Sequence, residues 1–85
     1  MSEQEIGTVT HFFGHLDVAA VAITAGGLAV GDTIRIKGHT SDFTTRVESM
    51  QLEHLMVSKA QAGDNVGIKV ASRAHEHDKV YLVTP

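Results

Sequence analysis

The sequence predicts an all-β protein, a six-stranded closed antiparallel barrel, from three observations. Apolar residues recur mostly with period two, as in strands that are buried on one face. Two Gly-Asp pairs, at residues 31–32 and 63–64, each precede a run of alternating aliphatic residues, and this pair is typical of the tight turns that open strands. The connections between six such runs are short, which suits a closed antiparallel barrel without exposed edges.

The first half of the chain supplies three of these strands. Residues 6–13 form the first strand, residues 14–17 the turn, and residues 18–24 a second strand of small aliphatic side chains. After a glycine break, residues 34–37 alternate isoleucine with basic residues, which predicts a strand buried on one face.

The longest run, residues 43–54, changes phase along its length. Its apolar alternation up to Val47 lies on one face, whereas Met50 and Leu52 have the opposite parity. A β-bulge near residues 48–49 would produce this change, because one inserted residue turns the following side chains to the other face and bends the strand.

The last third of the chain contains two further strands and one uncertain segment. Residues 66–70 form an alternating inward row, and residues 80–83 form the final strand. For residues 57–62, just before the second Gly-Asp turn, we expect a single helical turn.

Length and composition predict one soluble domain over residues 1–85. Hydrophobic residues make up 42% and charged residues 20% of the chain, as in globular proteins. The net charge of −3 argues against broad adhesion to nucleic acid, so any RNA contact would be local. The absence of cysteine and of a signal peptide or long apolar run predicts a cytoplasmic protein with no membrane contact.

Motifs for catalysis are missing from the sequence. There is no GxxxxGK[ST] phosphate loop, so we expect neither a nucleoside triphosphatase of the P-loop type nor a nucleotide partner. There is no GxSxG elbow, and no serine has a local feature that would activate its hydroxyl. We therefore expect a protein that is not an enzyme and that uses no cofactor.

Basic residues on outward strand positions form a candidate binding surface. Arg35, Lys37 and Arg46 belong to strands that we expect to be neighbours, and Lys69 and Arg73 extend the set. Such a stripe could contact RNA phosphates or an acidic protein partner. The alternative is that these side chains only meet water, as outward lysine and arginine usually do.

Aromatic residues offer a second, weaker candidate. Phe12 and Phe13 could stack on single-stranded bases, or one could fill the core while the other closes an end of the barrel.

The chain has six histidines, and two of them are weak candidates for a metal site. His75 and His77 enclose Glu76 and would face the same side of a strand, which permits two ligands on one metal. The alternative is a solvated polar connection between strands. Because the sequence shows no complete tetrahedral ligand set, we expect no metal.

Several segments resemble the second domain of the translation-factor GTPases: IGTVTHFF, GGLAVGDTIRIKG, VESMQLEH and AQAGDNVGIKV, spanning residues 6–83. The stretch from IKGHTSDF through VESMQLEH is similar to short stand-alone translation elongation factor-like proteins. It also resembles the C-terminal barrel of collagenase-like bacterial peptidases, which accompanies a separate catalytic domain.

The translation-factor resemblance implies a binding barrel rather than a reaction centre. In elongation factor Tu this barrel helps to hold the aminoacyl end of tRNA, and by position Glu48 and Asn65 match two of the residues involved. Gln51 stands where the family has a basic residue.

The sequence as a whole therefore predicts a stand-alone, non-catalytic barrel that binds RNA, ribosomal or protein partners. The alternative is an accessory protein-interaction subunit of a separately encoded peptidase-like enzyme.

Overall fold

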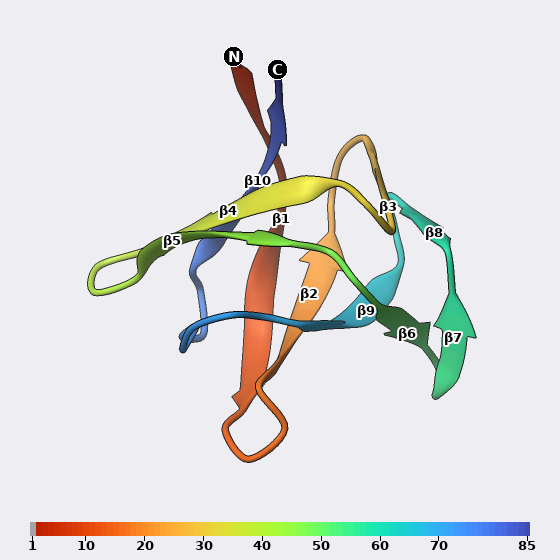
Figure 1. Cartoon of the computed structure of the whole chain (residues 1–85), viewed down its shortest axis with the longest axis horizontal. Helices are drawn as coiled ribbons and strands as arrows, with labels where there is room; N and C mark the ends of the chain where they lie inside the picture. Colours follow the sequence, from red (N-terminus) through yellow and green to blue (C-terminus); the bar gives the residue numbers. More distant parts are fainter. Residues whose placement is uncertain (1) are drawn as a thin grey trace.

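The computed structural model describes residues 2–85, which form ten β-strands and no helix. The all-β fold expected from the sequence is confirmed. Figure 1 shows the strands: β1 (Ser2–Phe13), β2 (Val18–Ile23), β3 (Gly27–Ala29), β4 (Thr33–Lys37), β5 (Asp42–Arg46), β6 (Met50–Leu52), β7 (Leu55–Val57), β8 (Lys59–Gln61), β9 (Asn65–Lys69) and β10 (Lys79–Thr84). Among the described residues there is no helix that is long and apolar enough to span a membrane.

Eight strands pair into one antiparallel sheet in the order β5-β4-β10-β1-β2-β9-β6-β7, and β3 and β8 form a separate ribbon. The sheet curls, and β4 and β5 cross in front of β1 in Figure 1. It is not closed into a barrel, so the expected six-stranded closed barrel is not confirmed. The reason lies at residues 47–49, which separate β5 from β6; β5 pairs with β4, whereas β6 pairs with β9 and β7.

The break at residues 47–49 also accounts for the phase change expected in this stretch. Thr45 and Val47 are buried, and the next buried side chain is Met50, of opposite parity. Instead of joining a strand pair, Val47 exchanges backbone hydrogen bonds with the first Gly-Asp turn: its N–H donates to the carbonyl of Asp32, and its carbonyl accepts from Gly31, both at 2.8 Å.

The core lies on the inner face of the curled sheet. Its fully buried side chains come from alternating positions on most of the strands, as period-two patterning requires. Met50 and Ile68 are direct cross-strand partners and are both completely buried. The largest of these side chains are Ile6, Ile34, Ile36, Met50, Ile68, Val9, Val21, Val47, Val66 and Val80.

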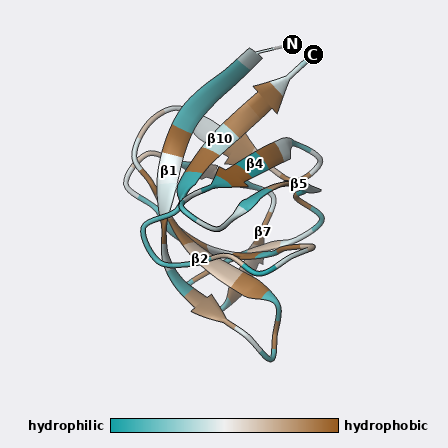
Figure 2. Ribbon diagram, turned by 90° about the vertical axis from the view of Figure 1, so that its left-hand side faces the viewer, coloured by the Kyte–Doolittle hydropathy of each residue, from teal (hydrophilic) through white to brown (hydrophobic). Residues whose placement is uncertain are grey.

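The two ends of the described chain lie side by side, because Ser2 pairs with Thr84. The first residues of β1 are hydrophilic and exposed, whereas the neighbouring part of β10 is hydrophobic (Figure 2).

The helical turn expected at residues 57–62 is wrong. These residues belong partly to β7 and β8, and β8 pairs with β3. The cause is tertiary: Leu28 and Ala60 are direct partners and both are buried, so the ribbon covers part of the core. Local sequence carries no signal for this pairing.

Candidate binding surface

A hollow lies on the outer face of β2, β9 and β6. Its volume is about 400 Å³, and it adjoins a second hollow of about 270 Å³, because Leu16, Val18, Gln51 and Gly67 line both. The larger volume lies near the lower end of the range of about 300–1,000 Å³ that is usual for ligand pockets.

Small residues at the bottom of this hollow make it deep. Ala20 on β2 is the direct cross-strand partner of Gly67 on β9, which has no side chain. The longer side chain of Gln51 on β6 continues this row on the other side of Gly67. A β-carbon on Gly67 would lie 3.3 Å from Cγ1 of Val18, a close contact, so any larger residue at this position would crowd Val18 and cover the floor.

The walls come from two turns. Phe13, the last residue of β1, and Leu16, in the β1–β2 turn, are 43% and 60% exposed although both are large and apolar. The Phe13 ring also packs edge-on against His11, with ring centroids 4.5 Å apart. On the other side, Glu53 and His54 form the two-residue turn between β6 and β7, and both have positive φ, at 51° and 67°.

Three of the residues predicted from the sequence gather around a third hollow of about 450 Å³. Arg46, Glu48 and Lys69 line it, and Lys69 also lines the second hollow, so the third hollow adjoins the second at this residue. Within residues 2–85, Arg46 and Lys69 form no ion pair. Asn65, another predicted residue, lines the first hollow.

Arg35 lies outside the hollows and is held by two carboxylates. Its Nε and Nη2 donate to the two oxygens of Asp42 at 2.7 and 2.8 Å, and its Nη1 donates to Oε2 of Glu3 at 3.1 Å. The hydrogen bonds from Arg35 hold the pKa of Asp42 below its ordinary value, and those to Asp42 and Glu3 raise the pKa of Arg35. The planar guanidinium suits this paired binding.

Lys37 is exposed on β4, and its cross-strand partners are Asp42 on β5 and Lys79 on β10. The structure thus divides the predicted basic stripe: Arg46 and Lys69 share a hollow, whereas Arg35 and Lys37 lie elsewhere. Whether any of these residues binds a partner stays a prediction.

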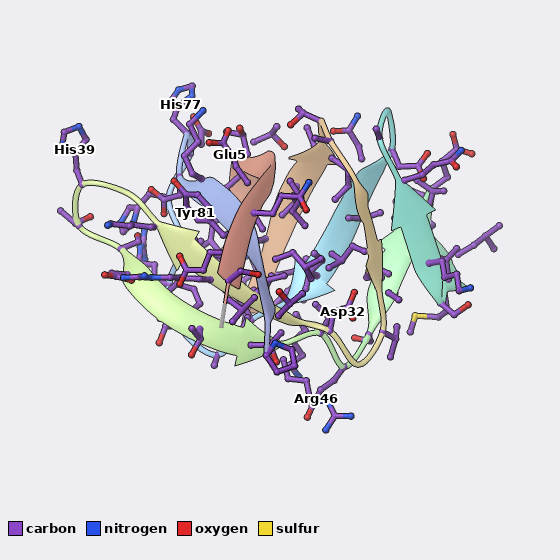
Figure 3. All side chains as sticks on the ribbon, turned by 90° about the horizontal axis from the view of Figure 1, so that it is seen from above. Glu5, Asp32, His39, Arg46, His77 and Tyr81 are labelled. Atoms are coloured by element: carbon purple, nitrogen blue, oxygen red, sulfur yellow. The ribbon has the colours of Figure 1, made fainter. Side chains whose placement is uncertain are left out.

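The two histidines weighed as metal ligands lie in a turn rather than in a strand. His75 Nδ1 is 2.7 Å from the hydroxyl oxygen of Ser41, and His77 has positive φ and donates its backbone N–H to the carbonyl of Val9. No group of three or more potential metal ligands occurs among residues 2–85. In Figure 3, His77 and Arg46 lie on opposite sides of the molecule.

The sequence placed Gly67 on the outward face of its strand but indicated no hollow there; it assigned no role to Leu16 and left the role of Phe13 open. A large apolar residue in a polar turn was the available signal for Leu16. The side chain of Phe12 is half-buried and packs against the core, and its ring centroid lies 5.8 Å from the guanidinium carbon of Arg73.

No protein-family model matches the chain. It is 39% identical over 80 residues to a Methanocaldococcus jannaschii protein described as an uncharacterised protease, and 34% identical over 77 residues to a collagenase of Porphyromonas gingivalis. These matches cover 93% and 89% of this chain but 19% and 21% of those proteins, so the chain spans about a fifth of the length of these curated relatives.

A solved structure shares the fold over nearly its whole length. The C-terminal domain of a Geobacillus thermoleovorans protein described as a candidate U32 peptidase has a TM-score of 0.87, with 95% of this chain and 93% of that chain covered, at 18% sequence identity. At this identity the likeness establishes the fold alone.

These findings confirm one of the expected resemblances and correct the other. The similarity to collagenase-like peptidases is confirmed, and the fold is that of a peptidase's C-terminal domain. The interpretation as a translation elongation factor-like protein is wrong, because the matching proteins are a protease, collagenases and a peptidase domain. The tRNA and ribosomal partners were implied by this resemblance alone, so they have no remaining support.

Proposed function

We propose that this chain is a non-catalytic accessory module that binds a separately encoded peptidase-like enzyme. The observation that carries the proposal is the unequal coverage: 93% of this chain matches only 19% of a protease. A match to so small a share of an enzyme is what an auxiliary domain would produce. The likeness to a peptidase's C-terminal domain supports the same interpretation.

The arrangement of Ser41, His75 and Asp78 supports a structural rather than a catalytic role. The hydroxyl of Ser41 is 2.7 Å from Nδ1 of His75, and a carboxylate oxygen of Asp78 lies 3.9 Å from the same nitrogen. In a serine triad the histidine instead uses one ring nitrogen for each partner. Ser41 is also only 5% exposed, which leaves little room for a substrate.

The decisive experiment is a binding measurement with a purified peptidase-like protein from the same genome. We expect a stoichiometric complex by size-exclusion chromatography and a micromolar or tighter Kd by calorimetry. Serum albumin is the control protein. Absence of a complex at micromolar concentrations would overturn the proposal.

A second measurement tests the catalytic part of the proposal. The chain alone, incubated with casein or denatured collagen, should release no peptides. Cleavage by the wild type that is lost in the Ser41→Ala variant would contradict a purely accessory role.

A further inference from the structure

We propose that the adjoining hollows on the outer face of β2, β9 and β6 are the docking surface for an extended polypeptide segment of the peptidase-like partner. The segment would place an apolar side chain against Phe13 and Leu16 and a carboxylate at Lys69. This inference rests on the proposed function and deepens it, because it assigns the surface and the chemistry of what binds there.

The shape of the surface suits an extended chain. Asn65, Gly67 and Lys69 lie on the same face of β9, about 7 Å apart at each step, and the first hollow, at Asn65 and Gly67, is followed along this strand by the second, at Gly67 and Lys69. The bare middle position, Gly67, opens the floor between the first and second hollows. A partner side chain can therefore enter between two polar positions of β9.

The apolar wall supplies an anchor. Phe13 and Leu16 are two of the large hydrophobic residues that remain exposed, and they line the same hollow. Burial of an apolar side chain in such a pocket is the usual main source of affinity at protein interfaces. The neighbouring amide groups of Asn65 and Gln51 can both donate to and accept from a peptide backbone.

The charges favour a polypeptide over a nucleic acid. Lys69 and Arg46 lie towards one end of the surface, but Glu48 lies beside them and Glu53 lines the first hollow. A sugar-phosphate backbone is bound by concentrated positive charge, and this mixed surface would repel part of it. A single carboxylate, in contrast, can pair with Lys69, which forms no ion pair within residues 2–85.

The test is a calorimetric titration of the purified peptidase-like protein with variants of this chain. We expect Leu16→Asp and Gly67→Val to weaken binding at least about tenfold, as loss of an interface anchor does. Lys69→Gln should weaken it by about threefold and reduce the dependence of Kd on salt. Leu16 is an exposed turn residue, so its substitution leaves the core intact even if Gly67→Val fails to fold.

Matched controls lie outside the hollows. Val30→Asp replaces another exposed aliphatic residue, and Lys37→Gln removes another exposed lysine; both should bind within about twofold of the wild type. If the wild type binds and Leu16→Asp binds equally well, the docking surface is wrong while the proposed function stands. If the wild type does not bind at all, both fail. Binding of single-stranded poly(U) that depends on Leu16 would overturn the polypeptide assignment.

Discussion

The carboxylate of Asp78 occupies the space that a β-carbon on Gly38 would need. One of its oxygens lies closer to that position than any real β-carbon contact, and the other accepts the backbone N–H of His75 at 2.8 Å. Gly38 in turn donates its N–H to the carbonyl of Ser41 at 2.7 Å. The β4–β5 hairpin and the turn before β10 are therefore joined through a buried carboxylate that only glycine can accommodate.

This relationship predicts a double-mutant effect. Gly38→Ala should destabilise the protein by about 1–3 kcal/mol, because an added methyl group forces well-packed atoms to move. In an Asp78→Ala background the same substitution should cost much less, since the obstructing carboxylate is gone. Urea unfolding of the four proteins measures the difference. Equal costs in both backgrounds would show that the contact is unimportant.

The core predicts a second outcome. Ile68 is completely buried opposite Met50, so Ile68→Ala should lower the free energy of unfolding by about 2–5 kcal/mol through lost burial and a residual cavity. The neighbouring side chain of Lys69 is exposed, and Lys69→Ala should stay within about 0.5 kcal/mol of the wild type. Chemical denaturation measures both. A small cost at residue 68 would mean that the two sheet strands repack freely.

The β6–β7 turn predicts a stabilising change. Glu53 and His54 both have positive φ, which suits a type I′ turn but costs non-glycine residues energy. Replacing them together, Glu53→Asn with His54→Gly, should raise stability by about 1 kcal/mol, because asparagine and glycine prefer this conformation. Thermal unfolding measures the gain.

The matched control is a glycine that already has the required conformation. Gly63 has φ of 99°, so Gly63→Ala should destabilise the protein by about 1 kcal/mol or more. If both variants shift stability in the same direction, positive φ does not govern these turns.

The Arg35–Asp42 pair predicts a pH dependence. Because the pKa of Asp42 is lowered in the folded state, its contribution to stability is present above the ordinary aspartate pKa of about 3.9 and is lost as the pH falls through the lowered folded value. Arg35→Gln should return the pKa of Asp42 towards its ordinary value. Carboxyl chemical shifts in an NMR titration measure it.

Glu3→Gln provides the control for this titration. It removes the other partner of Arg35 but leaves both hydrogen bonds to Asp42, so the pKa of Asp42 should remain low. An ordinary pKa in the wild type, or a low one in Arg35→Gln, would contradict the assignment.

Local patterns were sufficient for β1, β2, β4, β9 and β10, because burial on one face imposes period two on each strand separately. The alternation at residues 34–37 and 66–70 corresponds to β4 and β9, and the parity change before Met50 marks the break between β5 and β6. The pattern failed at residues 57–62. Residues 59–61 form a strand there because they pair with residues 27–29, which are distant in the sequence.

The candidate surface was predictable only in part for the same reason. Gly67 and Lys69 could be placed on the outward face of one strand, but their proximity to Leu16 depends on β2 lying beside β9. Likewise, Arg35 appeared free until β1 placed Glu3 next to it, 32 residues away in the chain.

The sequence by itself determined an all-β chain and the inward face of strands such as β4 and β9, because alternation of apolar side chains is a local property. Tertiary structure alone decided which strands are neighbours, that the sheet stays open at β5 and β7, and that a glycine between β2 and β6 leaves a hollow. These outcomes depend on pairing between distant segments, whose free energy comes from the assembled core rather than from any one strand.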